Sequence, residues 1–496
     1  MTAYVVMLVR TAWLCDDAYI SFRVVDNFIH GHGLRWNIVE RVQVYTHPLW
    51  LFLVSVCYFF TREIYFTAIF LSMAVSLAAL GVLSFGASKS RVGSALAVVL
   101  LLCSNAYVDY STSGLENPLT YLLLAVFAAL FLRQEPTPSH SLLLAFVASL
   151  GMVNRVDTAL LFAPALAYTL FRVRNARTVL LMAAGFAPWL LWEAFSLLYY
   201  GFPFPNTYYV KLGAGVPVFT LLKPGLAYLW DSLRNDSVTL PACAAALTAS
   251  LVLRQWRNVW LAAGMLLYLA YVISIGGDYM SGRFLAAPVF VAALVIAGLP
   301  PKGGWRIWGS AFACAVVLGY LLPHPTPFSR DNLTERAVSD AALVDFATRG
   351  VADARRYEYV RTGLLGACKG RPMPDCPDRE RGLLMWARRD TPFMILMNAG
   401  MLPFFAGPST YFLDVWGLGD AFRAHFPAAS GRRWAAGHVF RSYPPGYVDT
   451  LRTGENKLKD EQLSSSYERI KLIIRGPLFS RERLRAIVLQ NLGSRE

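Results

Sequence analysis

Two adjacent carboxylates are the first side chains in this sequence that could do chemistry. Asp16 and Asp17 follow directly on a short apolar segment and precede a stretch with apolar residues at helical spacing. A carboxylate at such a boundary could act as a general base toward a hydroxyl group. It could equally be solvated or cap the following helix. From the residues alone, both interpretations stand for each aspartate.

Three further polar blocks interrupt the apolar sequence. STSGLEN contains Glu116, NRVD contains Arg155 and Asp157, and GGDYMSGR contains Asp278 and Arg283. The arginines suit a phosphate, because a guanidinium can grip two oxygens at once. The glycines of the third block let the backbone approach a ligand closely. A capping turn, a plain salt bridge and a flexible loop with a snorkelling arginine are the corresponding structural interpretations.

The block PNTYYVK adds a mixed polar surface. Tyr208 offers a stacking surface for a sugar, and Lys211 offers a point charge for a phosphate. Tyrosine and lysine are also ordinary anchors at a membrane interface. His30, His32 and His47 share one polar stretch, but they lack the i, i+4 spacing of a helical metal site. We therefore predict no metal site, and no Walker loop or GxSxG motif indicates a nucleotide or a serine nucleophile.

Long apolar runs must position these blocks. The chain has 496 residues, of which 56% are hydrophobic and 16% are charged, and its mean hydropathy is +0.43. Soluble proteins carry about 25% charged residues, and about 20 apolar residues suffice for a helix to cross a bilayer. The pattern predicts a multi-pass membrane protein. Cationic loops that stay in the cytoplasm explain the net charge of +14 without nucleic-acid binding.

Charge asymmetry between the loops orients the spans. The apolar segment 48–61 is short for a span, so we expect a juxtamembrane helix there, with the polar loop 16–47 outside. This assignment leaves most cations of the short loops inside and places all five polar blocks outside. The stretch 18–29 is expected to be an amphipathic interfacial helix. About eleven spans result: an uncleaved first helix within 1–15, then 65–88, 91–108, 118–132, 141–153, 158–171, 178–199, 237–253, 258–275, 284–299 and 305–322.

A proline-rich linker that begins at Pro323 separates the apolar part from a polar tail. Residues 1–322 are predicted to form the transmembrane domain, and 323–496 a single C-terminal extracytoplasmic α/β domain. Cys368 and Cys376 lie in this tail without metal-type spacing. In an exported domain, this pair predicts a disulfide.

Blocks spread over nearly the whole chain resemble one family. Residues 16–50 (DDAYISFRVVDNFIHGHGLRWNIVERVQVYTHPLW) are similar to the opening of the bacterial terminal arabinofuranosyltransferases (AftB-like) and their ZomB-type relatives. STSGLEN, PNTYYVK, GGDYMSGRF, FLDVWGLGD, WAAGH and PPGY look like further blocks of that family. It belongs to the GT-C superfamily of membrane glycosyltransferases, and the 48–61 segment resembles the juxtamembrane helix of the protein O-mannosyltransferases. This chain differs from the family at two points. NRVD stands where the family is expected to have an Arg-Pro-acid block, and the tail is shorter than in the actinobacterial members.

The resemblance implies a mainly α, polytopic GT-C bundle in the bacterial inner membrane, with its active site and C-terminal domain facing the periplasm or exterior. It implies a polyprenyl-phosphate donor, with arabinofuranose as the expected sugar, and an envelope glycan or exported protein as acceptor. The catalytic carboxylate would be Asp17 or Asp16. The leaving phosphate would be held by Arg283, Lys211 and Arg155, and the sugar by Asp278, Glu116, Tyr208, His47 and Asp157. No cofactor is expected; a divalent cation is compatible with the site, although no motif indicates one.

Two other functional classes compete with the enzyme. A transporter or flippase for a lipid-linked sugar would be expected to show repeat symmetry and charged residues within its spans, and neither is evident. A non-enzymatic membrane protein of an envelope or motor-associated machine would leave the acidic residues dispensable. The sequence favours the glycosyltransferase over both.

Overall fold

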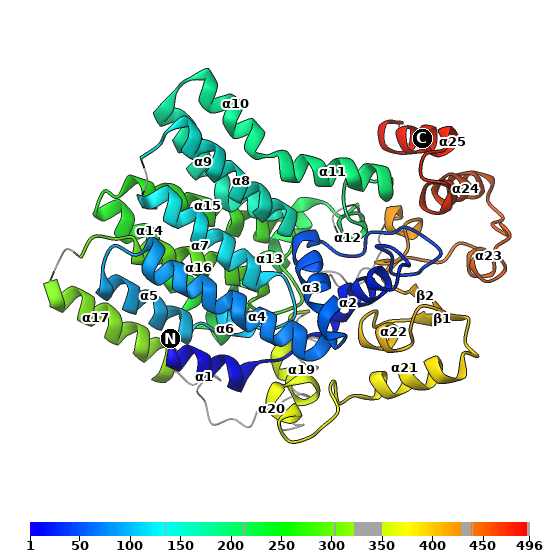
Figure 1. Cartoon of the computed structure of the whole chain (residues 1–496), viewed down its shortest axis with the longest axis horizontal. Helices are drawn as coiled ribbons and strands as arrows, with labels where there is room; N and C mark the ends of the chain where they lie inside the picture. Colours follow the sequence, from blue (N-terminus) through cyan, green and yellow to red (C-terminus); the bar gives the residue numbers. More distant parts are fainter. Residues whose placement is uncertain are drawn as a thin grey trace. The chain divides into compact units, whose positions relative to one another are not determined.

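The computed structural model describes residues 1–133, 135–211, 213, 215–301, 304–321, 350–427, 438 and 440–493. The chain is mainly helical, as predicted (Figure 1). It divides into two compact units. The first unit comprises Met1–Cys15, His47–Trp189 and Val218–Asp375, and the second comprises Asp16–Thr46, Leu190–Pro217 and Cys376–Glu496. The linker predicted from Pro323 and most of the WAAGH block lie outside the described residues.

The first unit is built from helices that mostly follow the predicted apolar segments. They are α1 (Thr2–Thr11), α3 (Pro48–Thr61), α4 (Ile64–Gly81, extended by a π-helical turn Val82–Ala87), α5 (Arg91–Cys103), α6 (Asn105–Asp109), α7 (Asn117–Arg133), α8 (Pro138–Asn154), α9 (Ala159–Val173), α10 (Ala176–Gly185), α13 (Val218–Asn235), α14 (Thr239–Val252), α15 (Trp256–Ser274), α16 (Ala286–Ala297), α17 (Gly304–Val316), α19 (Ala354–Thr362) and α20 (Leu364–Ala367). The sequence did not predict α13, whose apolar residues are interrupted by Lys223, Asp231 and Arg234, nor α19 and α20, which belong to the polar tail.

The core of the first unit surrounds α16. Every residue of this helix is buried, which suits a helix that is apolar on all sides. It packs against α5, α7, α14 and α15. Beside it, α9 and α15 approach closely because Gly264 has no side chain: a Cβ there would lie 2.2 Å from the Leu161 carbonyl oxygen. The stacked helices are visible in Figure 1.

Several helices have the length and composition of membrane spans. Among the described residues, Ile64–Ala87, Val156–Val173 and Trp256–Ser274 are long and apolar enough to cross a bilayer. The pair α10 and α11 (Ala187–Tyr199), bent by 47°, would be a fourth span if it crosses as one. The shorter apolar helices are Thr2–Thr11, Pro48–Thr61, Arg91–Cys103, Asn117–Arg133, Pro138–Asn154, Thr239–Val252, Arg283–Ala297 and Ile307–Gly319. The total of about eleven spans remains a prediction.

The second unit joins the first polar loop to most of the tail. Its helices are α2 (Asp16–Ile29), the part of α11 (Ala187–Tyr199) from Leu190 onward, α12 (Asn206–Lys211), α21 (Pro377–Arg388), α22 (Met401–Phe405), α23 (Tyr447–Thr453), α24 (Glu461–Arg475) and α25 (Arg481–Leu492). Two short parallel strands, β1 (Phe393–Leu396) and β2 (Tyr411–Asp414), pair with Phe393 opposite Tyr411. They are the only paired strands in the described part of the chain, so the predicted α/β class of the tail is not confirmed.

Buried arginine explains why α2 folds with the tail. Arg23 is 2% exposed and donates to the carbonyls of Trp36, Pro403, Gly407 and Thr410. A buried guanidinium must satisfy its donors, and these carbonyls come from both segments. The observed units therefore differ from the predicted boundary at 323, which had placed the 16–47 loop with the membrane helices.

The predicted disulfide is not formed in this structure. Cys368 and Cys376 are both free thiols, the first exposed and the second buried. The Cys376 Sγ lies 3.5 Å from the Met401 Sδ. The Cys376 side chain is therefore packed inside the second unit and is not bonded to Cys368.

Candidate active site

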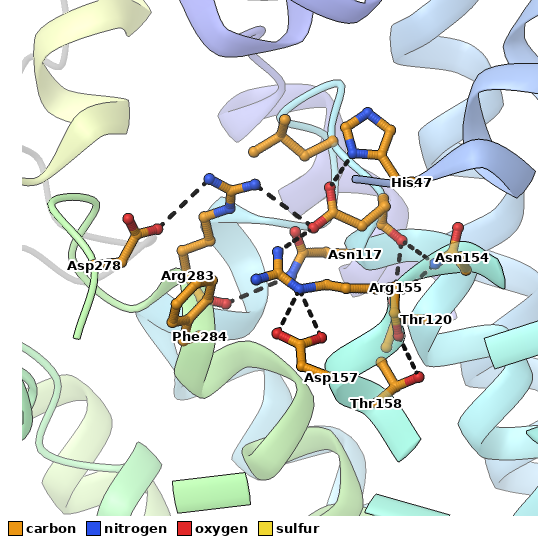
Figure 2. A network of polar contacts seen from close by, with 12 residues as sticks. His47, Asn117, Thr120, Asn154, Arg155, Asp157, Thr158, Asp278, Arg283 and Phe284 are labelled. Atoms are coloured by element: carbon orange, nitrogen blue, oxygen red, sulfur yellow. Dashed lines mark hydrogen bonds and ion pairs between the residues drawn. The ribbon is translucent and has the colours of Figure 1, made fainter. Parts of the chain in front are cut away.

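The first unit gathers most of the predicted polar residues into one network of polar contacts (Figure 2), in which Glu116 pairs with three other side chains. Arg155 Nη1 donates to Glu116 Oε1 at 2.6 Å, and Arg283 Nη2 lies 3.6 Å from the same oxygen. His47 Nδ1 lies 3.2 Å from Glu116 Oε2. These four side chains come from segments far apart in the sequence, and the structure brings them into one cluster.

Helix ends place Glu116 at this point. His47 immediately precedes α3, and Glu116 immediately precedes α7. Asn154, the last residue of α8, donates from Nδ2 to the Glu116 carbonyl at 3.1 Å and to Thr120 Oγ1 at 2.9 Å. Helix N-termini favour negative charge, so the backbone itself suits a carboxylate between α3 and α7.

Two further carboxylates hold the arginines from their other side. Arg155 Nε lies 2.9 Å from both carboxylate oxygens of Asp157. Arg283 Nη1 lies 3.5 Å from Asp278 Oδ2. In Figure 2 the aspartates lie beyond the arginines, so that positive and negative groups alternate through the cluster.

The charges in the cluster control the protonation of Glu116. Burial alone would raise the pKa of this carboxyl, but Arg283, Arg155 and His47 outweigh it and hold the pKa well below its usual range. Glu116 is therefore ionised at neutral pH. An ionised carboxylate can accept hydrogen bonds from sugar hydroxyls and can hold a guanidinium, but it is a weak base.

The two arginines are held unequally. Arg155 makes close contacts of 2.6 to 2.9 Å with Glu116 and Asp157 and lies 4.4 Å from the centroid of the Phe284 ring. Arg283 makes ion pairs of 3.5 and 3.6 Å, which are long for charge-assisted hydrogen bonds. An incoming anion would displace the partners of Arg283 more readily than those of Arg155. The geometry thus suits Arg283 to bind a ligand and Arg155 to fix Glu116.

Sequence reasoning missed residues that complete the cluster. Tyr268 donates to Asp157 Oδ2 at 3.3 Å, and Asn117 Nδ2 donates to the Arg283 carbonyl at 3.5 Å. Asn117 and Phe284 lay within the blocks already recognised, but Tyr268 lies inside an apolar helix, where one tyrosine carries no signal. Among the described residues no group of three or more His, Cys, Asp or Glu side chains could hold a metal ion.

Asp16 and Asp17 begin α2 in the second unit. Asp16 Oδ1 accepts from the Met401 backbone N–H at 2.8 Å. Burial, helped by the neighbouring Asp17 and Asp378, raises the pKa of Asp16 to about 7 against this hydrogen bond. Asp16 therefore connects α2 to the start of α22. The sequence had suggested as a structural role only that Asp16 caps its own helix.

Tyr208 and Lys211 also belong to the second unit, on α12. Asn206 starts this helix and donates to the carbonyls of Gly417 and Leu418 at 2.9 and 2.8 Å. The PNTYYVK block is thus attached to the FLDVWGLGD block. Tyr208 is 38% exposed, which leaves its ring accessible for stacking.

No protein-family model matches the chain. Among curated proteins it is 28% identical over 411 residues to the terminal β-(1→2)-arabinofuranosyltransferase of Mycobacterium tuberculosis. This alignment covers 71% of this chain and 63% of the relative. It is 26% identical over 537 aligned positions to the protein of the same name from Corynebacterium glutamicum, covering 89% and 77%. The chain therefore spans less than two thirds of the length of the mycobacterial relative.

Solved structures give the fold. ArnT from Cupriavidus metallidurans bound to undecaprenyl phosphate superposes with a TM-score of 0.52 at 15% identity, over 86% of this chain and 88% of ArnT. The apo state gives a TM-score of 0.50 at 16% identity, over 83% and 84%. This chain is similar to the terminal arabinofuranosyltransferases and has a GT-C fold. The predicted resemblance is confirmed. At this identity the GT-C likeness shows the architecture, while the roles of the clustered residues rest on their own geometry.

Proposed function

We propose that the chain is a membrane glycosyltransferase that transfers arabinofuranose from a polyprenyl-phosphate donor to an envelope glycan or an exported protein. The active site and the second unit would face the periplasm or the exterior of a bacterial inner membrane. The relatives and the fold support the reaction class. The donor, the acceptor and the orientation are inferences from the residues.

The observation that carries the proposal is the buried Arg283, whose ion pairs with Asp278 and Glu116 measure 3.5 and 3.6 Å. A buried ion network is weak evidence for stability, because desolvation offsets much of the attraction. A guanidinium kept 3.5 to 3.6 Å from two carboxylates is positioned to exchange one of them for a phosphate. Arginine binds phosphate through two parallel donors, which fits the phosphate of a lipid-linked sugar.

In the proposed reaction the acceptor oxygen forms a bond to the anomeric carbon while the bond from that carbon to the phosphate oxygen breaks. The electron pair leaves with the polyprenyl phosphate, whose charge Arg283 stabilises with help from Lys211. The acceptor proton passes to an aspartate of α2. We assign this base to Asp17, and Asp16, whose Oδ1 accepts the Met401 N–H, is the alternative.

The remaining residues would orient the sugar. Ionised carboxylates accept hydrogen bonds from hydroxyls, which suits Glu116, Asp278 and Asp157. Tyr208 would supply a stacking face. Arg155 would act through Glu116 as a positioning residue, because its close contacts leave less room for a ligand.

Transfer in proteoliposomes tests the proposal. Purified protein is given synthetic polyprenyl-phosphoryl arabinofuranose and an arabinofuranosyl oligosaccharide, and both the extended oligosaccharide and the released polyprenyl phosphate are measured. We expect equal amounts of the two products, with Arg283→Lys strongly impaired. Polyprenyl-phosphoryl mannose and 4-amino-arabinose serve as alternative donors. Movement of the donor across the bilayer without release of polyprenyl phosphate would support the flippase instead.

A further inference from the structure

Arg483 anchors α25 to the end of α11. Its side chain is fully buried and donates to the carbonyls of Leu198 at 2.8 Å, Tyr199 at 2.9 Å and Ile473 at 2.7 Å. Arg41 donates to the same Tyr199 carbonyl at 3.1 Å. The last carbonyls of a helix have no partners within the helix, and cations are favoured there. Two arginines therefore cap α11, and one of them belongs to α25.

The turn after α11 is covered by α24 and α25 (Figure 1). Gly201 has φ +86°, and a Cβ there would lie 2.2 Å from Ile473 Cγ2 and 3.3 Å from Ile487 Cγ1. Asn491 Nδ2 donates to the Gly201 carbonyl at 2.8 Å. Only glycine fits this turn, and α25 is consequently held directly at the point where α11 ends.

On its other side α25 exposes an apolar surface. The large apolar side chains there are Leu484, Val488, Leu489 and Leu492, with Phe479 in the preceding turn. Leu492 is 83% exposed and Phe479 is 73% exposed. The helical positions follow an i, i+4, i+5, i+8 spacing, which places them on one side of the helix. We call this set the α25 apolar face.

The end of α11 exposes leucines as well. Leu190 and Leu191 are 53% and 70% exposed, and Leu197 and Leu198 are 38% and 37% exposed. Together with α10 this helix has the length and composition of a broken membrane span. Through its buried side, α25 thus adjoins the end of an apolar helix whose surface suits lipid.

We propose that α25 is an interfacial helix that docks on the bilayer surface through the α25 apolar face. Interfacial helices bury an apolar side at the headgroup boundary while cationic side chains reach lipid phosphates. Arg481 and Arg485 are exposed near this face and suit anionic lipid. The inference rests on the proposed membrane insertion of α10 and α11. It goes beyond sugar transfer, because it gives the second unit its own contact with the membrane that carries the donor.

Lipid photocrosslinking in the full-length protein tests this contact. Benzoylphenylalanine replaces Leu489, and in separate proteins Leu191 on α11 or the exposed Ser465 on α24. Each protein is placed in nanodiscs of phosphatidylcholine with and without phosphatidylglycerol, irradiated, and searched for lipid adducts by mass spectrometry. Phe479 provides a second position on the α25 apolar face.

We expect lipid adducts at Leu489 and Phe479 at least tenfold above those at Ser465. We also expect Arg481→Gln combined with Arg485→Gln to remove any preference for phosphatidylglycerol. Adducts at Leu191 but none at Leu489 and Phe479 above Ser465 would overturn the docking proposal alone. An absence of adducts at Leu191 would overturn the insertion of α11, and the docking proposal with it. Crosslinks from Leu489 to protein would show that another segment or a second copy covers the face.

Discussion

Arg155 Nη1 lies 2.6 Å from Glu116 Oε1, while Arg283 Nη2 lies 3.6 Å from the same carboxylate oxygen. The difference separates two arginines that look equivalent in the sequence. A close, buried pair fixes the conformation of both partners, whereas the longer contact can be exchanged for a ligand at smaller cost. This unequal pairing leads to the first two predictions.

Arg283→Lys should lower the turnover of sugar transfer by about 10²- to 10³-fold, the usual loss when a charge-stabilising donor is removed. Lysine keeps the positive charge but lacks the planar fork that holds two phosphate oxygens. Initial rates in proteoliposomes measure the effect. The matched control is Arg257→Lys, whose partner Glu135 is 83% exposed and which should transfer sugar at the wild-type rate. Equal rates for the two variants would remove Arg283 from the site.

Glu116→Gln should destabilise the first unit by about 1–3 kcal/mol, because the buried guanidinium of Arg155 loses its 2.6 Å carboxylate and keeps only Asp157, so part of its charge is left uncompensated. Thermal unfolding in nanodiscs measures this loss. Combining it with Arg155→Met should cost less than the two single substitutions added together, since the orphaned charge is then absent. Additive effects would mean that the 2.6 Å contact contributes no coupling.

The sequence predicted which residues form this cluster better than it predicted which of them pair with one another. Glu116, Arg155, Asp157, Asp278 and Arg283 were expected on one side of the membrane, and the structure brings all five together. Their pairing was not predictable, because it depends on the distances between the ends of helices. A loop position restricts where a side chain can go, but not which of several opposite charges it will meet.

In the second unit the sequence predicted the separate elements but not that they associate. Helical periodicity predicted α2, and composition predicted a polar tail, yet nothing local indicated that they fold together. That association depends on Arg23, a cation in an amphipathic helix that sequence reasoning treats as solvated, but which instead binds four carbonyls. The disulfide prediction was incorrect for a similar reason: spacing along the chain says nothing about the burial of Cys376.

Stability should fall as pH rises through the pKa of Asp16. Burial raises this pKa to about 7 in the folded state, against about 3.9 for an unfolded aspartate. The folded state therefore binds the proton more tightly, and the stabilisation present at low pH is lost progressively toward pH 7. The expected loss between pH 5 and pH 8 is about 2–3 kcal/mol.

Denaturant unfolding of wild type and Asp16→Asn across this range measures the effect. The asparagine still accepts the Met401 N–H but does not titrate, so the pH-dependent difference between the two proteins isolates Asp16. A difference that stays constant with pH would show that the folded pKa of Asp16 is not raised.

Gly400→Ala should severely destabilise the second unit. A Cβ at this position would lie 2.0 Å from the Asp16 carbonyl oxygen and 2.6 Å from its Cγ, so the contact between α2 and α22 would have to open. Gly81→Ala is the matched control, since a Cβ there meets nothing within 4 Å; a helical alanine should be neutral or slightly stabilising. Thermal unfolding and limited proteolysis compare the two. Equal unfolding temperatures would contradict the close packing of Asp16 on Gly400.

The two aspartates of α2 should respond differently to the same substitution. Asp17→Asn removes the proposed base while keeping the size of the side chain, so transfer should fall by about 10²- to 10⁴-fold. Asp16→Asn keeps an oxygen that accepts the Met401 N–H, and its effect on the rate should be much smaller. Donor binding, measured with polyprenyl-phosphoryl arabinofuranose in the absence of acceptor, should survive in both variants.

The pH dependence of the rate distinguishes a base from a residue that merely positions the helix. If Asp17 accepts the proton, the residual activity of Asp17→Asn should rise with pH, because hydroxide replaces the missing base, whereas Asp16→Asn should keep the wild-type profile. A large loss in Asp16→Asn alone, with the wild-type rate in Asp17→Asn, would reverse the assignment and make Asp16, with its pKa of about 7, the base. Wild-type rates in both folded variants would exclude α2 from catalysis and favour a non-enzymatic role for the chain.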